Sequence, residues 1–110
     1  MTEYTSLKAS RRLADAGFRE ESDMGVYGCG GDTYFPITNA VDWSHATRAY
    51  RSDTLLEWLI TNDWDISIGM PHNKILVDAA SMKLNKRIPI EADTIPDALA
   101  EVVMKIMENK

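Results

Sequence analysis

The only cysteine of the chain, Cys29, lies in a glycine-rich segment that reads GVYGCGGD from Gly25 to Asp32. A cysteine acts as a nucleophile when a neighbouring base or positive charge lowers its pKa. The bases that could approach it are the two histidines, His45 and His72, but no local motif ties either of them to the thiol. We expect an unreactive thiol, and we keep a small enzyme that uses Cys29 with a histidine as an alternative function.

The glycines of this segment could also form a phosphate-binding loop. Such loops lead into a helix N-terminus, and the Walker loop also needs Lys followed by Ser or Thr. Here the glycines lead into Thr33, Tyr34 and Phe35, which are typical of a strand. We therefore predict a hairpin turn or a bulge, with no phosphate cofactor.

A metal site would need ligands at a defined spacing. Asp42 and His45 are three residues apart, and Cys29 and Asp32 lie upstream of them. The paired Cys/His motif of zinc sites is absent, so we predict a polar loop and no metal.

Acidic residues are densest at Glu20, Glu21 and Asp23, and Asp32 and Asp42 follow around the glycine-rich segment. Two carboxylates can act as acid and base, but nothing in the sequence fixes their separation. The simplest account is a solvated acidic face. The sharper hypothesis is a surface that competes with nucleic acid for a basic groove on a partner, because complementary charge steers such association.

A tryptophan, Trp43, lies in a polar segment between Phe35 and Tyr50. Such a residue either serves as a hot spot for a partner or folds back over the sheet, and the sequence leaves both open. The predicted partner-binding residues are Glu20, Glu21, Asp23, Asp32, Asp42 and Trp43.

These residues belong to a chain of 110 residues with 12 Lys+Arg, 17 Asp+Glu and a formal net charge of −5. An acidic chain without a basic block argues against direct binding of nucleic acid. A single cysteine excludes an internal disulfide framework and fits a reducing compartment. No run of about 18 apolar residues and no secretory signal is present, so we expect one domain (1–110) in the cytoplasm and no membrane contact.

Apolar residues at i, i+3 and i+4 predict three helices. The second carries the stripe Leu55, Leu56, Leu59 and Ile60, and Gly17 is a natural C-terminal residue for the first. We expect N-caps at Thr5 or Ser6 for the first helix, at Ser52 or Asp53 for the second and at Thr94 for the third, which should run over Ile95–Glu108.

Between the helices, short β-rich runs predict strands. Because they occur in adjacent pairs, we expect an α+β fold in which an antiparallel sheet of four to five strands packs with three helices, in the order αββαββ(β)α. Ala40–Arg51 is expected to be a long loop. The predicted strands are Gly25–Tyr27, Thr33–Ile37, Trp64–Ile68, Lys74–Ala80 and Arg87–Ala92, the last at an edge because of Pro89.

Three segments of the chain together resemble a known group of proteins. They are SLKASRRLADAGFREES from Ser6, AYRSDTLLEWL from Ala49 and IEADTIPDALAEVVMKIMEN from Ile90. In this order they resemble a widespread group of small proteins that bacteriophages and prophages encode, a group with no assigned activity. The chain departs from the group at Tyr50–Arg51, where the group usually has proline and threonine.

The resemblance implies a phage-encoded protein inside a bacterial host. Together with the acidic segment, the resemblance suggests a non-enzymatic binding protein that docks on a host protein. One such partner would be a defence complex that binds nucleic acid. The chain would then inhibit this complex in the manner of an anti-CRISPR protein. Besides the enzyme using Cys29, the remaining alternative is a structural homo-oligomer formed through the exposed edge of the hairpin strands.

Overall fold

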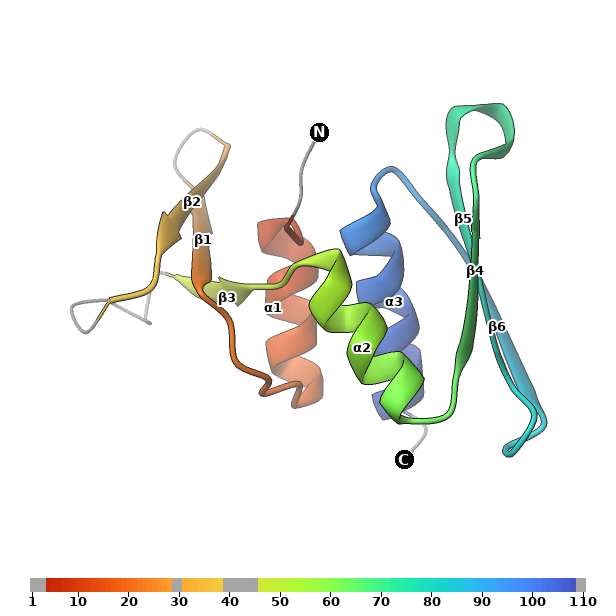
Figure 1. The fold of residues 1–110 in the computed structure, drawn as a ribbon. Coiled ribbons are helices and arrows are strands. Elements are labelled where there is room, and N and C mark those ends of the chain that lie inside the picture. Colours follow the sequence, from red (N-terminus) through yellow and green to blue (C-terminus); the bar gives the residue numbers. More distant parts are fainter. Residues whose placement is uncertain (1–3, 29–30, 39–45, 109–110) are drawn as a thin grey trace.

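Three helices lie between two small antiparallel sheets in the computed structural model, which describes residues 4–28, 31–38 and 46–108 (Figure 1). The predicted α+β class is confirmed, but the chain forms two three-stranded sheets instead of one sheet of four to five strands. The elements are α1 (Leu7–Ala16), β1 (Met24–Gly28), β2 (Asp32–Pro36), β3 (Thr47–Ala49), α2 (Ser52–Thr61), β4 (Asp65–Gly69), a 3₁₀ turn η1 (Pro71–Asn73), β5 (Ile75–Ser81), β6 (Lys86–Ala92) and α3 (Ile95–Glu108).

The N-terminal sheet has the strand order β2-β1-β3, and the C-terminal sheet has the order β4-β5-β6. Each of the five predicted strands forms, with ends shifted by at most one residue. A sixth strand, β3, lies within the segment that the sequence predicted as a loop, so that part of the prediction is wrong. Its three residues are too few to show an alternating pattern, and it forms because β1 offers a second row of backbone donors and acceptors.

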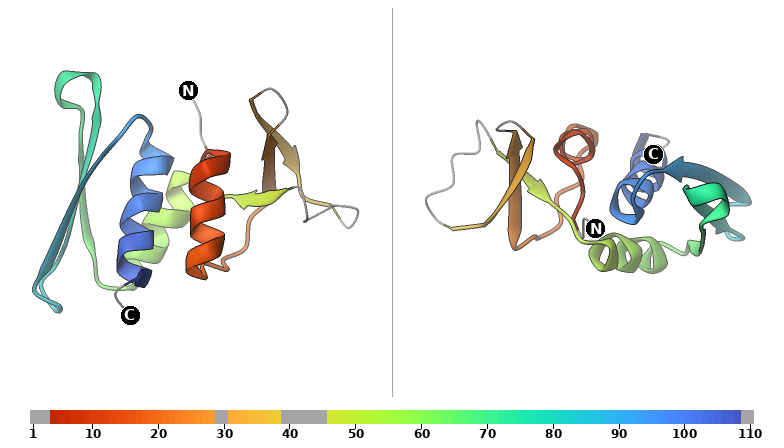
Figure 2. Two further views of the ribbon diagram at one scale, coloured as in Figure 1. Left: turned by 180° about the vertical axis from the view of Figure 1, so that it is seen from behind. Right: turned by 90° about the horizontal axis from the view of Figure 1, so that it is seen from above.

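The molecule is flat, with extents of 43 × 32 × 19 Å. Seen from above, α1 and α3 lie side by side between the two sheets, and α2 packs along one side of α3 (Figure 2). The N-terminal sheet contacts α1, while β5 and β6 of the C-terminal sheet contact α3. The helices therefore join the two sheets.

Helix α3 has the predicted bounds, and its apolar residues are buried on more than one side. Thr94 accepts the N–H of Asp97 at 3.3 Å through its side-chain oxygen, as predicted for an N-cap. The carboxylate of Asp97 accepts the N–H of Ser6 at 2.8 Å, so it links the beginnings of α3 and α1. Eight residues of α3 are buried: Pro96, Ala98, Leu99, Ala100, Val102, Val103, Met104 and Ile106.

Helix α2 begins at the expected place but without the expected cap. The residue at the N-cap position is Arg51, and no side chain caps the helix, so the prediction of Ser52 or Asp53 is wrong. The carboxylate of Asp53 instead accepts the N–H of Thr54 at 2.9 Å and pairs with Nε of Arg51 at 3.3 Å. The acid still lies in the first helical turn, where it interacts favourably with the helix dipole.

A cluster of buried hydrogen bonds links the N-terminal segment to the residues that precede α2. The hydroxyls of Thr5 and Ser10 are 2.7 Å apart, and the Thr5 hydroxyl accepts the N–H of Tyr50 at 3.0 Å. The N–H of Thr5 in turn donates to the Tyr50 carbonyl at 2.9 Å. Thr5 and Ser10 are fully buried, so this cluster replaces hydrogen bonds that water would otherwise make.

We predict that Thr5→Val lowers the free energy of unfolding by about 1–3 kcal/mol, because it leaves the buried N–H of Tyr50 without its acceptor and removes the hydrogen bond to the Ser10 hydroxyl. Urea denaturation would measure the change. Thr5→Ser is the control, because it keeps the hydroxyl and should cost about 1 kcal/mol for the lost methyl group. An equal loss in the two variants would contradict a role for the hydroxyl.

Helix α1 ends where the sequence predicted, at Gly17, whose φ is +95°. Its N–H donates to Ala14 and the N–H of Phe18 donates to Leu13, which turns Phe18 into the core. We expect Gly17→Ala to destabilise the protein by about 1–2 kcal/mol, because a Cβ disfavours this backbone conformation.

The matched control is Gly69→Ala in β4, where an added Cβ would meet only the Pro71 ring at 3.9 Å. This variant should change the stability by less than about 0.5 kcal/mol. Thermal or urea unfolding of both variants checks the pair, and equal stabilities would show that the turn at Gly17 tolerates a side chain.

Candidate partner-binding face

Part of the predicted acidic surface comes together at the start of β1. Glu21 and Asp23 line a shallow depression of about 380 Å³, and Asp53 lines it from the first turn of α2. Asp53 was not among the predicted residues, because it is 30 positions further along the chain and only the fold brings it here. Its partner Arg51 also lines the depression, so the site is acidic with one basic group at its edge.

The other predicted acids are placed differently. Asp32 pairs with Gly28 at the far end of β1, about 13 Å along the strand from Met24. Its carboxylate accepts the N–H of Leu7 at 3.0 Å and therefore serves the start of α1. Glu20 is exposed, and its backbone carbonyl accepts the hydroxyl of Tyr50 at 3.1 Å. Asp42 and Trp43 lie outside the described residues.

Of the residues considered for catalysis or metal binding, Asp32 and His72 lie in the described part of the chain, Asp32 in β2 and His72 in η1. His72 is exposed in η1, in the loop between β4 and β5. Gly28 and Gly31, on either side of the Cys29 segment, belong to the N-terminal sheet or its turn, across the helices from His72 (Figure 1). Cys29 and His45 lie outside the described residues. Within residues 4–28, 31–38 and 46–108 there is no group of three metal-ligating side chains, and none of the helices is long and apolar enough to span a membrane.

The tyrosines next to the acidic residues have a structural role. Burial raises the pKa of Tyr34, and the nearby carboxylates of Asp32 and Asp97 raise it further. Burial also raises the pKa of Tyr50. Both phenols therefore stay protonated at neutral pH, and the Tyr34 hydroxyl donates to the carbonyl of Thr5 at 3.0 Å.

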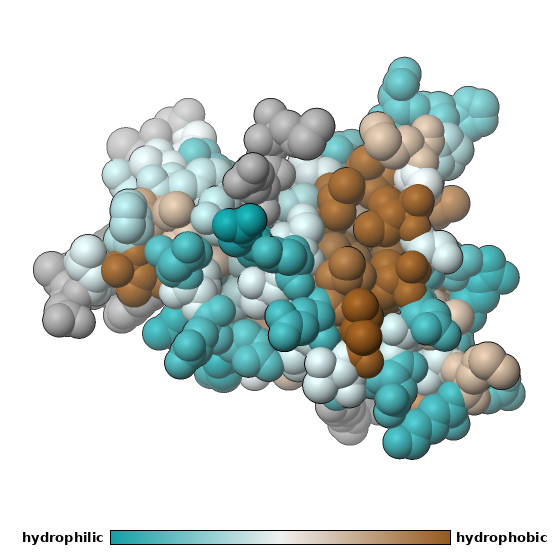
Figure 3. Space-filling model, in the orientation of Figure 1, coloured by the Kyte–Doolittle hydropathy of each residue, from teal (hydrophilic) through white to brown (hydrophobic). Residues whose placement is uncertain are grey.

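An exposed apolar area lies elsewhere, where α2 meets β4 (Figure 3). We name it the α2–β4 face and define it by Leu56, Ile60, Ile66 and Ile68. Ile60 is 61% exposed and Ile68 is 42% exposed, while Leu56 and Ile66 are half-buried. Ile66 and Ile68 lie opposite Ala79 and Val77 of β5, so they share the side of the sheet that faces the helices.

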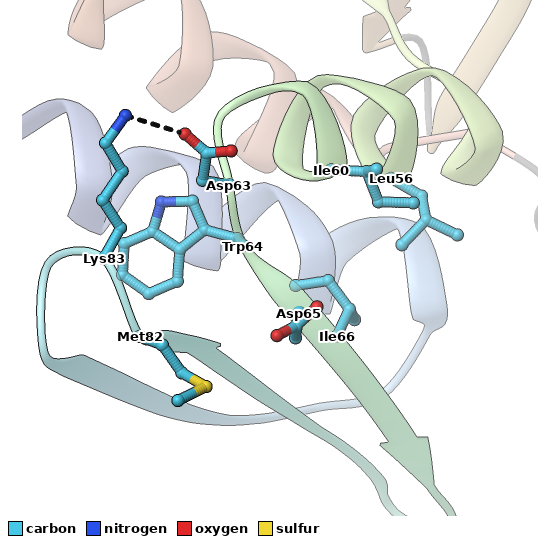
Figure 4. A pocket seen from close by; sticks show the side chains of 8 residues that line it. All are labelled: Leu56, Ile60, Asp63, Trp64, Asp65, Ile66, Met82 and Lys83. Carbon is cyan, nitrogen blue, oxygen red and sulfur yellow. Dashed lines mark hydrogen bonds and ion pairs between the residues drawn. The ribbon is translucent and has the colours of Figure 1, made fainter.

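A groove of about 610 Å³ lies within this face (Figure 4). Leu56 and Ile60 line it from α2, and Ile66 lines it from β4. Trp64, which is buried, forms part of its wall, and Met82 of the β5–β6 turn is 90% exposed beside it. Apolar side chains and the charged residues Asp63, Asp65 and Lys83 together line this groove, which is open to solvent.

Acidic side chains border the α2–β4 face. Asp53 and Glu57 lie on the same helical stripe as Leu56 and Ile60, because residues three and four apart are neighbours on a helix. Asp65 is the first residue of β4, and Asp63, two residues earlier in the chain, pairs with Lys83 at 3.3 Å. Because Asp53 also lines the depression with Glu21 and Asp23, the acidic residues connect the predicted acidic surface to the apolar groove.

The two edges of the C-terminal sheet differ in how they are protected. At one edge, β6 carries Pro89 at its centre and charged residues on both sides, features that discourage pairing with another strand. At the other edge, β4 reads DISIG, with no proline and one charge. Within the described residues, only β5 pairs with β4, so its second row of backbone groups is open.

In comparisons with known proteins, no family model, no curated protein and no solved structure matches this chain.

The opposite face of the same sheet is polar and carries an ion pair. Nε of Arg87 donates to the two carboxylate oxygens of Asp78 at 2.9 and 3.0 Å. These hydrogen bonds hold the pKa of Asp78 below its usual value of 3.8. An aspartate with a lowered pKa stabilises the fold at pH values above its unfolded pKa, and this contribution is lost as the pH falls through the lower, folded value.

We therefore predict that Asp78→Asn removes stability at neutral pH and that its difference from the wild type shrinks as the pH falls below about 3.8. Urea unfolding at pH 7 and at steps below pH 4 measures this difference. Because the pair is exposed, the effect should be small. A difference that grows at acid pH would contradict the assignment.

Proposed function

We propose that the chain is a non-enzymatic binding protein that docks on another protein through the α2–β4 face and the acidic residues that border it. The observation that carries this proposal is the exposed apolar side chains of the α2–β4 face, which adjoin a groove with carboxylates in its lining. Soluble proteins seldom leave such a patch uncovered unless it is an interaction site.

The chemistry of the face indicates the kind of partner. Ile60, Ile66 and Ile68 offer apolar area that a partner would remove from water, which supplies affinity. Glu57 and Asp65 at the border favour a partner with basic residues around an apolar centre, since opposite charges speed and orient the encounter. Glu21, Asp23 and Asp53 extend the negative charge beyond the groove, so the partner-binding hypothesis retains part of the predicted acidic surface.

The resemblance to small phage proteins makes a bacterial host protein the proposed partner. A defence complex that binds nucleic acid through a basic groove is the concrete version, because its groove would attract this acidic face in place of nucleic acid. On this proposal the protein works as an inhibitor by occupying that surface.

The test is capture of partners from host lysate with the wild type and two variants. We expect Ile60→Gln to reduce the recovery of a specifically bound protein at least tenfold, which corresponds to about 1.4 kcal/mol of binding free energy. Leu76→Gln is the control, because Leu76 is also exposed but lies on the opposite face of the sheet. Recovery should be unchanged in that variant.

Charge is tested in the same experiment. Glu57→Lys should weaken capture and make it less sensitive to salt, whereas Glu91→Lys on β6 makes the same change of charge away from the face and should leave capture unchanged. Equal recovery by the wild type, Ile60→Gln and Glu57→Lys would show that this face is not the docking surface.

A further inference from the structure

We infer that the partner contributes an extended segment that adds to β4 as a fourth strand of the C-terminal sheet, with apolar and basic residues in alternation. This inference rests on the proposed docking face and specifies how that face is occupied. It depends on three features: the open edge of β4, the uncovered apolar side chains next to it, and the charges around them.

The open edge supplies the backbone hydrogen bonds. An added strand would lie about 4.8 Å from β4 and pair with the row of N–H and C=O groups that β5 does not use. The protection of β6 by Pro89 and charges shows that the same sheet has one edge unsuited to such pairing. Strand addition is therefore directed to β4.

The side chains of β4 determine the pattern of the segment. Ile66 and Ile68 point to the helix side of the sheet, and residues directly opposite them on an added strand would have Cβ atoms about 4.5–5.5 Å away. Two apolar residues of the segment, separated by one position, would cover these isoleucines and reach Ile60 across the groove. They would bury the apolar surface that α3 leaves open.

The residue between these two would lie opposite Ser67, and the residue on the other side of the one that covers Ile66 would lie opposite Asp65, on the far side of the sheet from the isoleucines. A lysine or arginine there would face the carboxylate across the strand pair, a favourable arrangement. Glu57 and Asp53 on α2 add negative charge beside the groove. An alternation of apolar and basic residues therefore matches both sides of the edge, and an acidic segment would be repelled.

A second copy of the chain could use the same open edge, but its charge fits less well. The incoming copy would bring its own Glu57 and Asp53 on α2 to the same side of the sheet as those of the first copy. Like charges would then approach across the interface. A basic segment of another protein meets no such repulsion.

The probe is an acetylated and amidated heptapeptide with lysine and isoleucine in strict alternation, added to the full-length protein. We expect saturable binding with a Kd below about 1 mM. Amide hydrogen exchange should slow in β4 (Asp65–Gly69) and stay unchanged in β6 (Lys86–Ala92). A peptide of the same composition with its isoleucines consecutive should bind at least tenfold more weakly.

Matched variants locate the contact. Ile68→Ser should weaken binding of the peptide at least tenfold, whereas Leu76→Ser, at a residue of similar exposure on the opposite face, should change it less than twofold. Asp65→Lys should also weaken binding, and Glu91→Lys should not. Thermal unfolding establishes that each variant is folded, and the exchange measurement on the wild type does not depend on any variant.

Each other outcome overturns the inference. No saturable binding of the alternating peptide, or binding without slower exchange in β4, would exclude strand addition while capture through Ile60 could still support the docking face. Slower exchange in β4 that depends on protein concentration without peptide would identify a second copy as the occupant. If Ile60→Gln also leaves the recovery of partners from lysate unchanged, the proposed function fails together with the inference.

Discussion

The burial of α3 is the constraint on which the rest of the structure depends. α3 packs against α1, α2 and the strands β5 and β6, so it needs small or branched apolar residues on several sides. Ala98 and Ala100 allow close approach, and Leu99, Val102 and Val103 fill the space between neighbours. The two sheets lie on opposite sides of this helical layer, and the short hydrogen bond from Ser6 to Asp97 aligns α1 with α3 at their first turns. The helices thus decide which strand surfaces are covered.

The exposed face follows from this arrangement. A helix with its side chains is about 10 Å wide, so it covers about two strands spaced 4.8 Å apart. α3 covers β5 and β6, which leaves the third strand to α2. α2 packs along α3 and contacts β4, and Trp64 and Ile66 line the groove beside them. Ile68 lies further along β4 and remains exposed, with Ile60 across the groove. The apolar face therefore results from one helix serving a three-stranded sheet.

The sequence predicted elements well where a pattern was long and local. The fourteen residues of α3 show a sustained helical period and a capping threonine, so its bounds were predicted correctly. β3 has three residues and depends on β1 for its existence, so no local pattern could reveal it. The stripe on α2 predicted an apolar helix face, but a stripe does not say how far the neighbouring elements extend, and Ile60 is exposed. Likewise, spacing along the chain grouped Asp32 with Asp23, whereas the fold separates them and brings Asp53 to Asp23 instead.

The positions of the acidic residues indicate the kind of partner, which the net charge alone does not. A charge of −5 on 110 residues argues against binding nucleic acid directly, but it does not choose a partner. On the proposed mode of binding, backbone hydrogen bonds along β4 would be the same for every sequence, so they would supply affinity without selection. Selection would come from the alternation that Ile66 and Ile68 impose and from the carboxylates of Asp65 and Glu57, which penalise acidic segments. A small protein could then distinguish its partner at one sheet edge, because that edge selects for both the spacing of apolar residues and the charge of an extended chain.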